Sequence, residues 1–213
     1  MYPSTFLPNS RMPVGSAPCW SLPVSLIAFG CLGAAAAQGA VLNFEGLADS
    51  TPVDGIYAAQ GVTFTGTVAL TSGISLNEFE FPPASGMGVA SDDGGPVSGT
   101  FTTPVTSLSA SFTYVAPVTL RGFDATDTEV VMMSSAFAEN FVSSGNPANE
   151  VLSLSHAGGI HRFSIEGLPA GYSFAMDDFS FTPVPEASSA AVVGAALGAF
   201  AWFRRVRPGS RNA

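Results

Sequence analysis

Two closely spaced pairs of carboxylates are the residues best suited to acid–base chemistry. Glu78 and Glu80 are two positions apart, so an extended chain places both on one face. Asp177 and Asp178 are adjacent. Carboxylate pairs cleave glycosidic bonds, with about 5 Å between the two groups in retaining enzymes. Catalytic pairs usually come from different strands beside an aromatic groove, whereas each of these pairs lies within one short segment. We therefore expect no enzymatic activity. The alternative is a secreted glycoside hydrolase or lyase.

Other catalytic patterns are weak in this sequence. His156 and His161 are five residues apart around Gly158-Gly159, which predicts an exposed hairpin and not a helical zinc motif. No G-x-S-x-G nucleophile motif occurs. Both tryptophans, Trp20 and Trp202, lie near the chain ends, which leaves three tyrosines to stack on a sugar: Tyr57, Tyr114 and Tyr172.

The charge is strongly acidic. The 213 residues include 16 acidic residues and 7 basic residues, all of them arginine. Between Val41 and Pro183 there are fifteen acidic residues and two arginines, which gives a net charge of −13. Binding to nucleic acid needs clustered Lys and Arg, so this composition excludes it. It fits either a solvated acidic surface or an affinity for divalent cations.

Cysteine usage limits the chemistry further. Cys19 and Cys31 both precede Val41. The central segment therefore has no disulfide, no thiolate nucleophile and no cysteine ligand for zinc. Its own core, alone or with a bound ion, must stabilise it.

The central segment predicts β structure. Leu108, Ala110, Phe112 and Tyr114 alternate with polar residues, the pattern of a half-buried strand. Ten short runs of this kind predict an all-β, two-sheet antiparallel sandwich of jelly-roll type. The expected strands are 41–45, 61–66, 67–72, 97–103, 108–115, 118–124, 128–135, 150–155, 160–167 and 172–182. Two long connections, 81–96 and 136–149, are expected at the ends of the sheets, where binding sites often lie.

Both chain ends predict targeting segments around a domain at 40–182. Residues 1–39 contain an apolar run at 22–37 that follows Arg11 and ends in four alanines, the layout of a signal peptide with a helical core. Residues 187–203 carry no charge, and a span usually needs roughly 20 such residues. This predicts a short C-terminal transmembrane helix followed by a basic cluster, Arg204, Arg205 and Arg207.

The tail resembles a known sorting signal. Pro185-Glu186, the apolar span and the arginines follow one another as in the PEP-CTERM class of exported proteins of Gram-negative bacteria. The resemblance covers 183–213 and implies recognition of Pro185 and Glu186 by a membrane protease, exosortase. It further implies an inner-membrane intermediate, then location at the cell surface or in the extracellular matrix. Ala187 replaces the usual second proline, and a plain C-terminal anchor would share every feature except the Pro-Glu pair.

The domain resembles secreted, carbohydrate-binding-like jelly rolls. The resemblance rests on three segments, 43–47, 57–64 and 176–181. It implies neighbouring first and last strands and a structural calcium ion held by Glu45 and Asp178, with Asp177 on the opposite face of the pleat. Calcium takes six to eight oxygen ligands, which carboxylates and loop carbonyls supply. We therefore expect a non-enzymatic surface or matrix protein that binds extracellular polysaccharide.

Overall fold

The protein is built from β-strands. The computed structural model describes residues 39–185, and these contain nine strands, two 3-10 turns and no α-helix. All pairs between the strands are antiparallel, which confirms the predicted all-β antiparallel class. The elements are β1 (Ala40–Leu42), η1 (Ala58–Gln60), β2 (Val62–Thr65), β3 (Thr67–Thr71), β4 (Gly88–Asp92), β5 (Val97–Tyr114), β6 (Thr119–Phe123), β7 (Glu129–Ser134), η2 (Val142–Ser144), β8 (Glu150–Glu166) and β9 (Phe174–Pro183).

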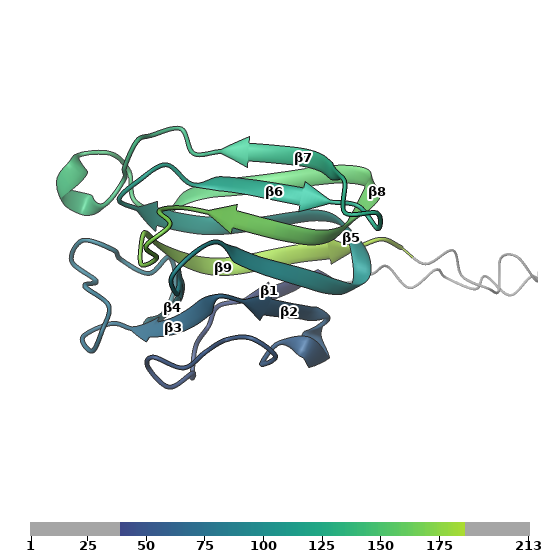
Figure 1. Ribbon diagram of the computed structural model, residues 1–213. Coiled ribbons are helices and arrows are strands. Elements are labelled where there is room, and N and C mark those ends of the chain that lie inside the picture. Colours follow the sequence, from purple (N-terminus) through teal and green to yellow (C-terminus); the bar gives the residue numbers. More distant parts are fainter. Residues whose placement is uncertain (1–38, 186–213) are drawn as a thin grey trace, which may run out of the picture. The chain divides into compact units, whose positions relative to one another are not determined.

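The two long strands, β5 and β8, each take part in both layers of the fold (Figure 1). The first part of β5 pairs with β2 and with the second part of β8. From Val105 onward β5 pairs with β9 and with the first part of β8. β6 and β7 extend the first layer, whereas β1, β4 and β3 extend the second. Register shifts beside Val105 mark where β5 passes between the layers.

Aromatic side chains from both layers form the core. The ring centroids of Phe64 on β2 and Phe179 on β9 lie 5.2 Å apart, although the two strands do not pair. Phe163 on β8 lies 5.1 Å from the same Phe179 ring. The two sheet faces therefore pack against each other as a β-sandwich. The predicted alternation on β5 is confirmed, because its four apolar positions, Leu108, Ala110, Phe112 and Tyr114, are all buried.

The strands differ from the prediction at four places. β1 ends at Leu42, three residues before the predicted end at 45. β4 lies inside the predicted loop 81–96, and all five of its residues are buried. β5 continues through Pro104, so the strands predicted at 97–103 and 108–115 are one bent strand. β8 continues through Gly158-Gly159, so the strands predicted at 150–155 and 160–167 are another. Pro104 falls in the register break of β5, where no amide donor is needed, and Gly159 has a φ of 89°. The predicted hairpin at His156 and His161 is therefore wrong.

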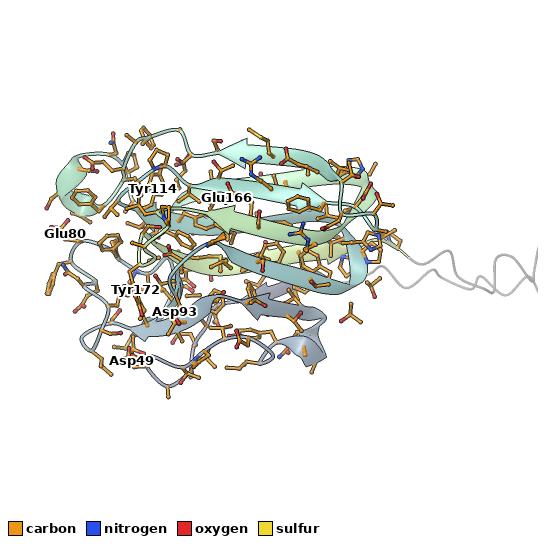
Figure 2. The ribbon with its side chains drawn as sticks, viewed as in Figure 1. Asp49, Glu80, Asp93, Tyr114, Glu166 and Tyr172 are labelled. Atoms are coloured by element: carbon orange, nitrogen blue, oxygen red, sulfur yellow. The ribbon has the colours of Figure 1, made fainter. Side chains whose placement is uncertain are left out.

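The first and last strands lie side by side, as the sequence resemblance implied. Ala40 pairs with Phe181, so the two ends of the described chain leave from the same end of the sandwich. Tyr172 precedes β9 and lies at the opposite end (Figure 2). We call that opposite end the loop end; it carries the connections 93–96, 115–118, 135–149 and 167–173.

Several predicted targeting features fall outside the described residues. These are the signal peptide before Gly39, Glu186 of the sorting motif, the transmembrane helix and the basic cluster Arg204, Arg205 and Arg207. Pro185 is described: it is exposed and follows the end of β9. Within residues 39–185, no helix has the length and apolar character needed to cross a bilayer.

Candidate functional site

A pocket of about 180 Å³ opens at the loop end. Its walls come from β3, β4, the start of β9 and the segment 72–81. The lining combines the aromatic residues Phe81 and Tyr172 with three small polar residues and four buried or half-buried apolar ones: Ser75, Asn77, Ser91, Leu70, Leu76, Phe174 and Ala175. The Phe174 ring itself packs against Phe112 in the main core. Aromatic faces with a few polar groups are the usual composition of a small-molecule site. We therefore treat this cavity, hereafter the loop-end pocket, as the candidate functional site.

Tyr172 presents the most accessible ring of the lining. Its side chain is 61% exposed, and its hydroxyl donates a hydrogen bond of 3.0 Å to Asp93 (Figure 2). The Asp93 carboxylate accepts this bond and so raises the pKa of Tyr172. The hydrogen bond to Asp93 orients the ring at the mouth of the pocket.

The backbone around Tyr172 is equally constrained. Tyr172 has a positive φ of 51°, and its amide donates to the Asp92 carbonyl at 2.9 Å. Gly171 precedes it in the left-handed region, and a Cβ there would lie 2.2 Å from the Gly94 nitrogen. Only glycine fits this close approach. The two turns therefore lock together and fix the position of Tyr172.

Buried Asp92 ties the pocket floor together. Its carboxylate is 0% exposed and accepts hydrogen bonds from the Ser173 amide at 2.8 Å, the Ser173 hydroxyl at 2.7 Å and the Phe174 amide at 3.3 Å. The neighbouring Ser91 hydroxyl donates to the Phe174 carbonyl at 2.8 Å. These bonds attach the end of β4 to the beginning of β9, which contributes Phe174 and Ala175 to the pocket lining.

Carboxylates also hold the loop that forms the outer wall. Asp49 accepts hydrogen bonds from the Thr71 amide at 2.8 Å and from the hydroxyl of Ser75. The bond from Ser75 is the main reason that the pKa of Asp49 is lowered. Glu78 accepts the Gly73 amide at 2.9 Å. These hydrogen bonds fix the wall together with a small apolar cluster in which Leu76 packs with Val89 and Ala175.

Only one of the three predicted sugar-stacking tyrosines is available. Tyr114 is fully buried, and its hydroxyl donates to Glu150. Tyr57 is half-buried, with its ring edge-on to Phe44 at 5.7 Å. Tyr172 remains as the exposed platform.

The predicted catalytic carboxylates are not arranged as an accessible pair. Glu80 accepts two hydrogen bonds from Ser143, which lower its pKa, whereas a general acid needs a raised pKa. Burial raises the pKa of Asp177, but that side chain is 1% exposed. Glu78 accepts a hydrogen bond from Gly73, whereas Glu80 accepts its hydrogen bonds from Ser143 in another loop. These positions do not favour the hydrolase or lyase alternative.

The predicted metal ligands converge on one segment, Ser85–Gly88. Glu45 accepts the amides of Met87 and Gly88, both at 2.7 Å. Asp177 accepts the Ser85 amide at 2.7 Å, and Asp178 accepts the Ser85 hydroxyl at 2.8 Å. The two aspartates were expected on opposite faces of the pleat. A β-bulge at Asp178, with a φ of 49°, instead directs both of them to Ser85.

No group of three acidic or histidine side chains within residues 39–185 is placed to hold a metal ion. Donors from the 85–88 segment occupy one oxygen of Glu45, one of Asp178 and one of Asp177. Hydrogen bonds from these donors stabilise the three carboxylates in the structure. Calcium at Glu45 and Asp178 remains a hypothesis from the sequence.

The calcium hypothesis predicts a metal-dependent melting temperature. A ligand that binds only the folded state stabilises it by about 2.7 kcal/mol at one hundred times its Kd. At about 2–4 °C per kcal/mol, millimolar calcium should raise the melting temperature by several degrees relative to chelator. Asp178→Ala should remove that difference. Equal melting of the parent protein in calcium and in chelator would contradict the hypothesis.

A second hollow, larger at about 360 Å³, crosses β1, β9, β5 and β8. Its floor is a set of small hydroxyl side chains, Ser107, Ser109, Ser153, Ser155, Ser180 and Thr182. Its one aromatic residue, Phe181, is only 5% exposed, so no ring is presented to a ligand. We therefore base the functional assignment on the loop-end pocket.

Only part of this site was predicted from the sequence. The sequence identified Tyr172 as a possible sugar-stacking residue and the segment 81–96 as a candidate binding loop. It did not identify Ser75 or Asn77, because small polar residues in a serine-rich chain carry no distinguishing pattern. A signal was available in Leu168-Pro169-Ala170-Gly171, a turn sequence that precedes an aromatic residue and a strand.

Comparison with known proteins gives structural likeness only. No protein-family model matches the sequence, and no curated protein matches it. The K2 cleaved adhesin domain of Lys-gingipain is 13% identical, with 68% of this chain and 99% of that chain covered and a TM-score of 0.44. A DUF4465 family protein from Bacteroides caccae is 12% identical, with 69% and 100% covered and a TM-score of 0.45. The carbohydrate-binding module TmCBM61, solved in complex with β-1,4-galactotriose, is 11% identical, with 65% and 100% covered and a TM-score of 0.33. At these scores we draw no function from the likeness.

Proposed function

We propose that this chain is an exported, non-enzymatic glycan-binding protein whose site is the loop-end pocket. The observation that carries the proposal is the exposed ring of Tyr172, fixed by its backbone and by Asp93 at the mouth of a cavity. Apolar faces of sugar rings stack on such aromatic platforms, while hydroxyl and amide groups accept and donate hydrogen bonds around them. Ser75 and Asn77 supply those polar groups here.

The size of the pocket limits what enters it. A volume of about 180 Å³ is below the usual range of roughly 300–1,000 Å³ for sites that bury a whole drug-sized ligand. One sugar ring or the end of a chain is therefore the unit that fits. The rest of a polysaccharide would lie outside the pocket.

The proposed export route agrees with the position of the site. In this proposal the signal peptide sends the chain out of the cytoplasm, and the PEP-CTERM-like tail leads through the inner membrane to the cell surface or matrix. Pro185 lies near the paired ends of β1 and β9, opposite the loop end. A chain attached through this tail would present the pocket away from the attachment point. Intact-mass measurement of the native protein would report the processing of both ends.

Replacing Tyr172 tests the proposed site. The change Tyr172→Ala removes the stacking surface, and we expect affinity for a retained glycan to fall by about tenfold. Tyr172→Phe keeps the ring and should retain most of the affinity. Because Tyr172 is exposed, both variants should melt close to the parent. Binding is measured by glycan array and then by calorimetry on the best ligand.

A matched control lies in the same connection. Leu168 is 44% exposed and does not line the pocket, so Leu168→Ala should bind like the parent protein. The proposal fails if the array retains no polysaccharide. It also fails if Tyr172→Ala and Leu168→Ala have the same affinity for the ligand.

A further inference from the structure

Two carboxylates bond directly to residues that line the loop-end pocket. Asp93 accepts the Tyr172 hydroxyl, and Asp49 accepts the Ser75 hydroxyl. In sequence, Glu78 adjoins the lining residue Asn77, and buried Asp92 adjoins Ser91. The lining itself is uncharged, and the nearest charges that the hydrogen bonds place beside it are negative.

No basic side chain balances this charge at the pocket. Within residues 39–185 the arginines are Arg121 on β6 and Arg162 on β8, and neither lines the cavity. Arg121 is paired with Glu129 and Glu166, and Arg162 with Asp127. A ligand in the pocket is consequently close to the Asp93 and Asp49 carboxylates without a compensating cation, and an excess of one sign of charge around a cleft attracts ligands of the opposite sign.

The aromatic rings of the pocket also favour a positively charged ligand. The face of an aromatic ring attracts a cation within about 6 Å, and this attraction is strengthened where water is displaced. Tyr172 is exposed at the pocket, and Phe81 is half-buried in its wall. Rings and carboxylates together form the type of site that holds an ammonium group.

We infer that the loop-end pocket selects sugars with a free ammonium group, such as the amino sugars of a de-N-acetylated glycan. This inference rests on the proposed function and names its ligand class. Neutral sugars of the same shape bind more weakly because they gain only the stacking and hydrogen bonds. Uronic acids and sulfated sugars are rejected because their anions would face Asp93 and Asp49.

The test compares three oligosaccharides of equal length on the full protein. Glucosamine oligomers carry ammonium groups, N-acetylglucosamine oligomers share the backbone without the charge, and oligouronates carry carboxylates. By calorimetry in low salt (about 20 mM) we expect the glucosamine oligomer to bind most tightly and the oligouronate not to bind. In high salt (about 500 mM) the advantage of glucosamine should shrink, since partly exposed charges are screened.

Two isosteric variants locate the effect. Asp93→Asn keeps an acceptor for the Tyr172 hydroxyl and removes the charge, so affinity for the glucosamine oligomer should fall about two- to fivefold while affinity for the acetylated oligomer stays the same. Asp127→Asn at the β6–β7 turn removes a charge at the opposite end and should change neither affinity.

The outcomes separate this inference from the proposed function. If the acetylated and free amino oligomers bind equally, or if the oligouronate binds best, the inference is overturned and glycan binding stands. If none of the three binds and the array also retains no glycan, the proposed function fails and the inference fails with it. Equal loss in Asp93→Asn and Asp127→Asn would overturn the assignment to this pocket.

Discussion

Replacing Asp92 by alanine is expected to lower the free energy of unfolding by about 3–5 kcal/mol. The carboxylate is fully buried and accepts four hydrogen bonds, one of them a long bond from the Ser91 hydroxyl and two from the consecutive amides of Ser173 and Phe174. Alanine would leave the Ser173 amide, the Ser173 hydroxyl and the Phe174 amide without an acceptor in a site that water does not reach. Each such orphaned group costs about 1–3 kcal/mol. The melting temperature should fall by about 10 °C.

Two further variants show whether the hydrogen bonds are the cause. Asp92→Asn keeps one acceptor oxygen, so it should destabilise less than alanine. Asp54 is an exposed aspartate outside this network, and Asp54→Ala should shift the free energy of unfolding by less than about 0.5 kcal/mol. The measurement is thermal and urea unfolding followed by circular dichroism. A melting temperature of Asp92→Ala within about 2 °C of the parent would contradict the role given to this carboxylate.

Local sequence pattern predicted most of the strands. β2, β3, β6 and β7 begin and end within about one residue of the expected ranges. Each combines β-branched residues with flanking turn signals, and the alternation on β5 and β8 also identified which side chains are buried. Where one face of a strand is buried and the other is solvated, the sequence carries the period-2 signal directly.

The pattern failed where both faces of a strand are covered or where a strand bends. β4 is a short run of small residues, buried throughout, and therefore has no alternation to detect. Val89 on β4 packs with Leu76 of the loop that covers it. The bends at Pro104 and Gly159 have the residues of ordinary turns, and only long-range pairing shows that the strands continue through them.

The candidate site was less predictable than the fold. Phe81 and Tyr172 meet only because the loop before β4 folds over the outer face of β3, β4 and β9. The exposure of the three tyrosines was likewise decided by tertiary packing, which buries Tyr114 and leaves Tyr172 accessible. Neither fact is encoded in a local motif.

The sequence shows that the domain is acidic, but it does not show which groups the carboxylates contact. Within residues 39–185, eight of the fifteen carboxylates accept a hydrogen bond from at least one main-chain amide: Glu45, Asp49, Glu78, Glu80, Asp92, Asp124, Glu150 and Asp177. These contacts fix long loops that have little core of their own. A short acidic side chain is well suited to this purpose because each oxygen accepts from amides that strand pairing leaves free.

One buried amide side chain should be as sensitive as Asp92. Asn140 lies in the β7–β8 connection and is 0% exposed. Its Oδ1 accepts the Tyr114 amide at 2.6 Å, and its Nδ2 donates to the carbonyls of Phe112 at 2.9 Å and Pro147 at 3.1 Å. It therefore attaches the connection to the end of β5. We expect Asn140→Ala to cost about 3 kcal/mol of unfolding free energy, because three polar backbone groups lose their partner.

The isosteric change Asn140→Asp should cost more than alanine at neutral pH, and its cost should depend on pH. A carboxylate here would face the Phe112 and Pro147 carbonyl oxygens, so burial and these acceptors would raise its folded pKa above the unfolded value of about 3.9. Its contribution is then most favourable below that value and is lost as pH rises through the raised pKa.

Urea unfolding at about pH 4 and about pH 7 measures this difference. Relative to the parent at each pH, Asn140→Asp should be more destabilised at the higher pH, whereas the deficit of Asn140→Ala should be similar at both. Asn43 is an exposed asparagine whose side chain only accepts a hydrogen bond, from the Glu45 amide, so Asn43→Asp should cost less than about 1 kcal/mol at either pH. Equal costs for the aspartate and alanine variants of Asn140, independent of pH, would show that its Nδ2 does not donate to the two carbonyls.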